Sequence, residues 1–144
     1  MANVVYNSAL KELDDGTINY LSDTIKVMLV TSSYTPNRDT HSRRSSVTNE
    51  VSGTGYTAGG FTLGSKTITQ DDTLDRATYD AADVTADPIT FTGATQAVVY
   101  KSTGVAANDN LICCIDLGGT FSPAAGPFTI QWSSTGGVLY KEQG

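Results

Sequence analysis

Hydrophobic residues in this chain come in short runs with a period of two, separated by segments rich in Gly, Ser, Thr, Asn and Asp. A period of two places every second side chain on one face of a β-strand, whereas an amphipathic helix needs a period near 3.6. The strongest run is Thr24–Ser32. Its residues Ile25, Val27 and Leu29 share one face, and the other face is largely apolar as well. We therefore expect a central strand that is covered on both sides.

The same alternation predicts further short strands, with turn signals between them. These are Phe61–Thr69, Arg76–Thr85, Pro88–Thr92, Thr95–Lys101, Leu111–Leu117, Phe128–Trp132 and Val138–Tyr140. Many short strands in a chain of 144 residues predict a single all-β domain over residues 1–144. We expect an antiparallel β-sandwich or a jelly-roll-like barrel with one short N-terminal helix.

The predicted helix lies close to the N-terminus. Asn7 or Ser8 would cap it, and Leu10 and Leu13 would share its buried face. The sequence Asp-Asp-Gly at 14–16 would end it. Acidic residues at a helix C-terminus oppose the helix dipole, so we expect a short helix that is held by packing.

The segment Glu50–Gly60 contains four glycines, and part of it spells G-x-G-x-x-A. That motif binds dinucleotides only where a helix follows, but the next residues are rich in β-formers. No helix N-terminus is then present to hold a pyrophosphate. We interpret Gly53, Gly55, Gly59 and Gly60 as residues that let the backbone bend sharply or approach a neighbour. Tyr56 is the one large side chain of this loop, and we predict that it is an exposed subunit contact at a flexible tip.

The charge balance is acidic, with a net charge of −6 and a pI of about 4.4. An acidic domain repels phosphates, so neither nucleic acid nor an anionic membrane surface is an expected partner. No apolar run approaches the roughly 20 residues that span a bilayer, and the N-terminus lacks the pattern of a secretory signal. We expect a protein made in a cytoplasm.

Positive charge gathers in the polar segment Ser33–Asn49, which we expect to be a long loop. Arg38, Arg43 and Arg44 are three of the nine basic residues of the chain. A loop of this length is functional or disordered. Two interpretations follow: a solvated surface loop, or an electrostatic contact with another subunit through these three arginines.

An acidic cluster is the best candidate for chemistry. Its members are Asp71, Asp72, Asp75, Asp80 and Asp83. Three interpretations are open: an exposed turn with Asx hydrogen bonds, a calcium site, or a paired-carboxylate hydrolase. The spacing does not match an EF-hand, and nothing in it places two carboxylates across a cleft.

Other reactive residues are few. His41 is the single histidine, and Cys113 and Cys114 are adjacent, so neither tetrahedral zinc ligation nor a disulfide between them is expected. Neighbours on a strand face opposite sides, and we expect both thiols to be buried. Trp132 and Tyr140 could stack on a sugar, although burial of Trp132 is the favoured interpretation. We therefore expect no enzyme, no cofactor and no metal.

Several strings of this sequence resemble a family of small structural proteins from tailed bacteriophages and prophages. They are Met1–Ser8, Asp23–Pro36, Glu50–Gly60, Thr69–Thr85, Ala97–Gly104 and Phe128–Ser133. The resemblance covers nearly the whole chain in the same order, and it departs from the family pattern in the loop from Arg38 to Arg44 and at Cys113-Cys114.

The resemblance implies a virion component without catalysis. Its expected role is a head decoration or cement protein that binds across capsomers beside the major capsid protein, commonly as a trimer. The helix near Ser8–Leu13 or the loop Glu50–Gly60 would contact the shell. The alternative within the same class is a tail- or fibre-associated protein that binds the host surface, through Trp132 or the tyrosines.

Overall fold

The computed structural model describes residues 3–142, and strands account for 44% of the chain against 8% for helices. The chain is therefore all-β with one short α-helix, as predicted. In chain order the elements are β1 (Asn3–Val5), α1 (Asn7–Asp14), β2 (Ile25–Val30), the 3-10 turn η1 (Arg44–Ser46), β3 (Phe61–Thr62), β4 (Thr67–Asp71), β5 (Arg76–Asp80), β6 (Val84–Ile89), β7 (Ala94–Lys101), β8 (Asn110–Phe121), β9 (Gly126–Ile130) and β10 (Leu139–Glu142).

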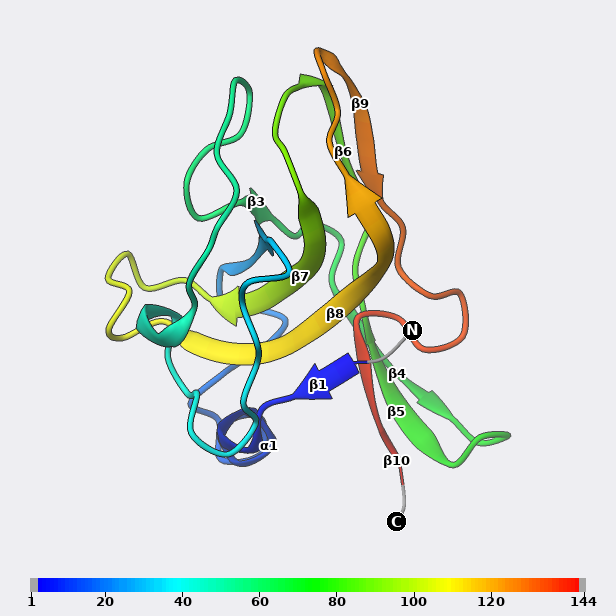
Figure 1. Ribbon diagram of the computed structural model, residues 1–144. Helices are drawn as coiled ribbons and strands as arrows, with labels where there is room; N and C mark the ends of the chain where they lie inside the picture. Colours follow the sequence, from blue (N-terminus) through cyan, green and yellow to red (C-terminus); the bar gives the residue numbers. More distant parts are fainter. Residues whose placement is uncertain (1–2, 143–144) are drawn as a thin grey trace.

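A curved antiparallel sheet with the order β1-β8-β7-β2-β3 forms the centre of the molecule (Figure 1). Strand β2 lies inside this sheet, paired with β7 on one side and β3 on the other. Its residues Ile25, Val27 and Leu29 enter one hydrophobic cluster, while Met28 and Val30 enter a second. The prediction of a central strand covered on both faces is confirmed.

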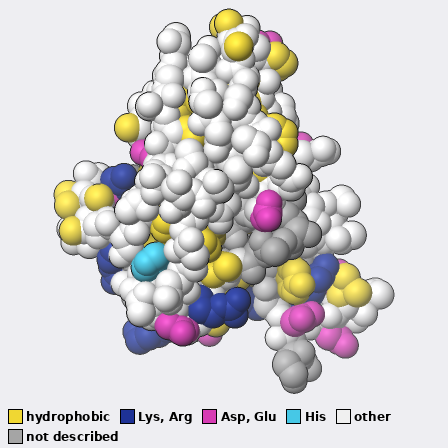
Figure 2. All heavy atoms as spheres, viewed as in Figure 1, with side chains coloured by type: hydrophobic (Ala, Val, Ile, Leu, Met, Phe, Trp, Pro, Cys, Tyr) yellow, Lys and Arg dark blue, Asp and Glu magenta, His cyan; other side chains and the backbone are white. Residues whose placement is uncertain are grey.

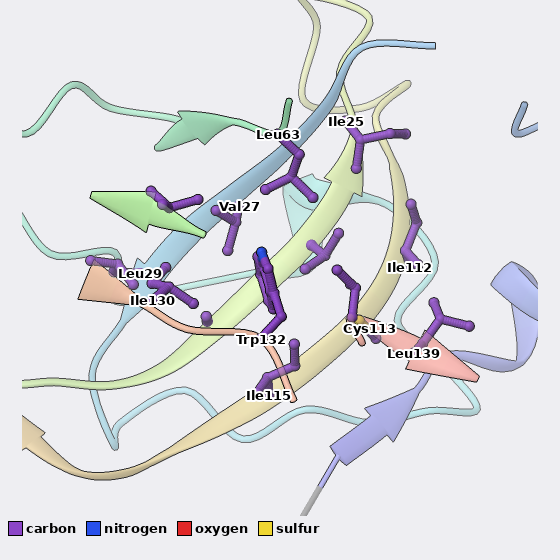
Figure 3. Close-up of a cluster of buried hydrophobic side chains, with 14 of the residues drawn as sticks. Ile25, Val27, Leu29, Leu63, Ile112, Cys113, Ile115, Ile130, Trp132 and Leu139 are labelled. Carbon is purple, nitrogen blue, oxygen red and sulfur yellow. The ribbon is translucent and has the colours of Figure 1, made fainter. Parts of the chain in front are cut away.

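The larger cluster fills the space between this sheet and two smaller sheets, which have the orders β10-β5-β4 and β6-β9. Figure 3 shows Trp132 among side chains from β2, β8 and β9, including Val27, Cys113 and Ile130. Trp132 is 6% exposed, and its Nε1–H donates to the carbonyl oxygen of Ala82 at 3.0 Å. The predicted burial of Trp132 is confirmed.

The smaller cluster lies on the opposite face of the central sheet. There the segment around α1 and the loop 33–49 supply Tyr6, Ala9 and Tyr34, which pack with Met28 and Cys114. Cys113 belongs to the larger cluster and Cys114 to the smaller one, and both are free buried thiols. The prediction that the two cysteines face opposite sides is confirmed.

Four predicted elements differ from the observed ones. The expected strand Pro88–Thr92 is not a separate strand, because only Pro88 and Ile89 lie in one, as the end of β6. The expected strand Phe61–Thr69 is two strands in different sheets, because the chain turns at residues 63–66, where Ser65 has a φ of 50°. The expected strand Arg76–Thr85 also breaks, ending as β5 at Asp80 before β6 begins. Strand β8 continues through Gly118 to Phe121, where we expected a turn.

Two leucines point away from the faces that the sequence predicts: strict alternation along Leu111–Leu117 would place Leu111 on the face of Cys113, and we expected Leu10 on the buried face of the helix. Ile112 is an extra residue between the pairs Val99–Cys113 and Tyr100–Leu111, so Leu111 points into the smaller cluster, away from Cys113. In α1, Ala9 and Glu12 are buried, whereas Leu10 is 44% exposed. The helix begins after Tyr6, without a side-chain cap from Asn7 or Ser8.

No helix within residues 3–142 has the length and apolar character needed to cross a membrane. The more specific form, a β-sandwich or a jelly-roll-like barrel, stays a prediction.

Candidate functional site

The loop 33–49 is fixed to the rest of the molecule by two arginine–carboxylate pairs. Arg43 Nη1 donates to Glu12 Oε1 of α1 at 2.9 Å, and Asn110 donates to the other carboxylate oxygen. Glu12 is 6% exposed, so two donors satisfy a carboxylate that is buried under the loop. Arg43 therefore ties the loop to α1 and to the start of β8.

The second pair joins Arg44 to Asp109. Arg44 Nε donates to Asp109 Oδ2 at 2.6 Å, and the guanidinium lies 5.2 Å from the centre of the Tyr100 ring. Asp109 also accepts from the backbone N–H and the hydroxyl of Thr103. Burial would raise the pKa of Asp109, but the hydrogen bonds from Thr103 and Arg44 outweigh it and lower the pKa. The carboxylate therefore stays ionised in the folded protein at neutral pH.

Because of these two ion pairs, most of the positive charge predicted for this loop is neutralised within the chain. Arg43 and Arg44 are 35% and 24% exposed, and each is matched by an acidic partner of the same chain. Arg38 is exposed and takes part in none of the ion pairs found within residues 3–142. Arg43 and Arg44 are therefore not simply solvated side chains of a surface loop. The electrostatic contact with another subunit stays a prediction, and among the described residues of this loop Arg38 is the arginine that is free to make it.

Three aromatic side chains joined by hydrogen bonds, Tyr6, Tyr34 and His41, also hold the loop 33–49 in place. The hydroxyls of Tyr6 and Tyr34 are 2.7 Å apart, and the Tyr34 hydroxyl lies 3.0 Å from His41 Nδ1. The N–H of Asn37 also donates to Nδ1, so this nitrogen is an acceptor and the ring proton is on Nε2. Tyr34 then donates to His41 and Tyr6 donates to Tyr34. Burial raises the pKa of both tyrosines.

The loop Glu50–Gly60 is packed, and Tyr56 is not its exposed tip. Tyr56 is 8% exposed; its hydroxyl accepts from the N–H of Leu29 at 3.0 Å and donates to Glu50 Oε2 at 2.7 Å. The same Glu50 oxygen accepts from the N–H of Gly59. The prediction of an exposed Tyr56 is wrong, because its ring fills a gap beside Phe61 and its hydroxyl satisfies a buried backbone donor of β2.

The glycines of this loop have the role that we expected. A Cβ on Gly60 would lie 1.9 Å from the carbonyl oxygen of Val27, and a Cβ on Gly53 would lie 1.8 Å from that of Thr90. Gly60 also has a φ of 85°, in the left-handed region. The loop thus lies close against β2 and against the residues that follow β6.

The acidic cluster separates into parts. Asp71 Oδ1 accepts from the N–H groups of Thr73 and Leu74, as in the predicted Asx turn. Asp80 lies at the other end of β5, and Asp83 accepts from the N–H of Trp132. Within residues 3–142 no three His, Cys, Asp or Glu side chains are grouped so that they could hold a metal ion.

The thiols and aromatic rings lie mostly inside the molecule. Burial raises the pKa of Cys114 to about 12 and also raises that of Cys113, so neither thiol is an accessible nucleophile. Six of the seven tyrosines are buried, and the exception is Tyr140, which is 42% exposed. The Arg76 guanidinium covers the Tyr140 ring at 4.1 Å from its centre. A sugar-stacking role of Trp132 has no exposed ring to support it.

An apolar hollow of about 240 Å³ opens between β8 and β9, lined by side chains that include Leu117, Phe121 and Phe128. The sequence did not reveal this hollow, because the two strands that line it belong to different sheets. The pairs Glu12–Arg43 and Asp109–Arg44 were missed for a similar reason: their members are far apart in the chain.

No family model, no curated protein and no solved structure matches this chain.

Proposed function

We propose that this chain is a non-enzymatic virion structural protein of a tailed bacteriophage, and that it decorates the head by binding across capsomers beside the major capsid protein. The sequence resemblance suggests the class. The observation that carries the role is the position of three of the exposed apolar side chains, Val105, Leu74 and Phe121, which lie on three different segments of the fold.

Three segments of the fold carry these side chains, and two of them, the loop between β7 and β8 and the turn between β4 and β5, project from different sides of the molecule (Figure 1). The loop 102–109 carries Val105, which is 54% exposed. The turn between β4 and β5 carries Leu74, which is 48% exposed. The end of β8 carries Phe121, which is 40% exposed. Figure 2 shows hydrophobic side chains at the left edge, where Figure 1 has the loop between β7 and β8, and at the top, where it has the turn between β8 and β9.

This distribution suits a bridging protein better than an enzyme. Small-molecule sites gather their groups in one concave pocket, whereas a protein that joins neighbouring subunits needs contacts at separated points. Burial of apolar surface contributes roughly 25 cal/mol per Å² at each contact, and simultaneous engagement of several contacts multiplies the affinity. The internal arginine pairs hold the loops in one conformation, which lowers the ordering cost on binding.

Binding to purified phage heads tests the proposal. We expect the chain to sediment with assembled heads and not to bind unassembled capsid subunits, because only the assembled shell presents several contact points at a fixed spacing. Val105→Asp and Leu74→Asp should each weaken binding about tenfold or more, since a charge is then placed in an apolar contact. Thr85→Asp, at an exposed position of β6, is the matched control and should bind normally.

Two results would overturn the proposal. One is equal binding to assembled heads and free subunits, or binding to neither. The other is saturable binding to host cells in place of heads, which would support the tail- or fibre-associated alternative. The trimer that the resemblance implies stays a prediction, and sedimentation of the purified protein measures it.

A further inference from the structure

Strand β4 offers an open and regular sheet edge. It is an outer strand of the sheet β10-β5-β4, so one row of its backbone groups has no strand partner within the described part of the chain. Four of its five residues are exposed, and its pairing with β5 has no register shift. The run Thr67–Gln70 contains no charge, no glycine and no proline, and its β-branched residues favour strand pairing.

The other outer strands carry features that discourage pairing with another chain. In the five-stranded sheet, β1 has three residues and β3 has two. Strand β6 contains Pro88 and a register shift, and β9 contains Pro127. Strand β10 has four residues and carries Lys141 and Glu142. Short length, proline and charge all discourage pairing at a sheet edge, and among the outer strands described β4 has the longest run without proline or charge, Thr67–Gln70.

The charges at the two ends of β4 select the direction of a partner strand. Lys66 precedes the strand, while Asp71 and Asp72 lie at its other end. The Lys66 ammonium donates to the carbonyl oxygen of Asp23 and lies 5.9 Å from the centre of the Tyr20 ring, without a carboxylate partner within residues 3–142. A second β4 aligned in parallel would bring like charges together. An antiparallel one would bring Lys66 near the acidic end of its partner.

We propose that β4 pairs with β4 of a second copy of this chain, in antiparallel orientation and centred on Thr69. In this register Thr69 lies opposite its own copy, Thr67 lies opposite Asp71, and Lys66 lies near Asp72. The Thr67 hydroxyl can donate to the Asp71 carboxylate across the pair. The contact is isologous and has twofold symmetry, so it adds to any threefold contact and does not replace it.

Charge substitutions at the twofold position test this pairing in the full-length protein. Thr69→Lys places two like charges directly opposite each other, and Thr69→Glu does the same with the other sign. We expect each variant to halve the mass of the assembly measured by sedimentation equilibrium. An equal mixture of the two variants should restore the mass, because opposite charges then meet. Thr85→Lys on β6 is the matched control, and circular dichroism checks that every variant is folded.

The pairing is overturned if the unmodified protein is a monomer or a trimer up to its highest soluble concentration. It is also overturned if folded T69K has the same mass as the unmodified protein, or if the T69K and T69E mixture stays at half mass. These outcomes do not depend on head binding, so this inference and the proposed function can fail separately.

Discussion

At the scale of single residues, a few buried polar groups hold the two long loops in one conformation. Glu12 and Asp109 are carboxylates under the loop 33–49, and Tyr56 is a hydroxyl under the loop Glu50–Gly60. Each makes two or more hydrogen bonds, and at least one of them joins a group far away in the sequence. Removal of one such group leaves its partners buried and unsatisfied, which costs more than the bond contributes.

Tyr56→Phe tests the role of the buried hydroxyl. The change removes the acceptor of the Leu29 N–H and one donor to Glu50, and it leaves the ring in place. We expect the free energy of unfolding to fall by roughly 1–3 kcal/mol, as measured by urea denaturation. Tyr140→Phe, on an exposed ring, is the control and should change stability by less than about 0.5 kcal/mol. If Tyr56→Phe left the free energy of unfolding unchanged, the buried hydroxyl would not have this stabilising role.

Asp109→Asn tests the Arg44 pair through its pH dependence. We expect a loss of about 2 kcal/mol at pH 7, below the roughly 3–5 kcal/mol of a fully buried pair, because Arg44 is 24% exposed. Folding lowers the pKa of Asp109, so its stabilisation is present above the unfolded pKa of about 3.9 and is lost as pH falls through the folded pKa.

The difference in stability between the unmodified protein and Asp109→Asn should therefore be large at pH 7 and smaller at pH 3. Urea denaturation at both pH values measures it, with Asp75→Asn in an exposed turn as the control. A difference that is the same at both pH values would show that the carboxylate charge of Asp109 does not stabilise the fold.

At the scale of elements, strong local patterns predicted the structure well. The alternation in β2 and in Phe128–Trp132 gave the right faces, because burial on a strand repeats every two residues. Prediction failed where one residue changed the register or the direction of the chain. Ile112 is such a bulge in β8, and Ser65 turns the chain between β3 and β4.

The positions of the loops 33–49 and Glu50–Gly60 could be predicted from the sequence, but the contacts that hold these loops could not. Their glycines and arginines are visible there, yet Arg44 and Asp109 are separated by 65 residues and Asn110 and Glu12 by 98. No local pattern reports a pair at such a separation. Tyr56 was therefore expected to be exposed, although Glu50 and β2 enclose it.

Gly60→Ala tests how closely the loop Glu50–Gly60 packs on β2. Gly16 has almost the same φ, 86° against 85°, but a Cβ there would meet nothing within 4 Å. Gly16→Ala should cost about 1–2 kcal/mol from backbone conformation alone. Gly60→Ala adds a clash with Val27 and should cost several kcal/mol more or prevent folding. Equal effects of the two changes on thermal unfolding would contradict the packed loop.

At the scale of the whole molecule, the fold combines a fixed interior with apolar groups on different surface segments. The loop 102–109 and the turn between β4 and β5 project from different sides of the molecule, and the end of β8 is the third of these segments (Figure 1). We propose that these segments contact the capsid shell and that the open edge of β4 pairs with a second copy. In both proposals the functional contacts lie on the surface of the protein and not in a pocket.

Electron microscopy of the intact phage particle tests the central claim most directly. We expect density that fits this fold on the outside of the head, across the joints between capsomers, with Val105, Leu74 or Phe121 turned toward the shell. Density for the chain in the tail or its fibres, or a head without it, would contradict the account.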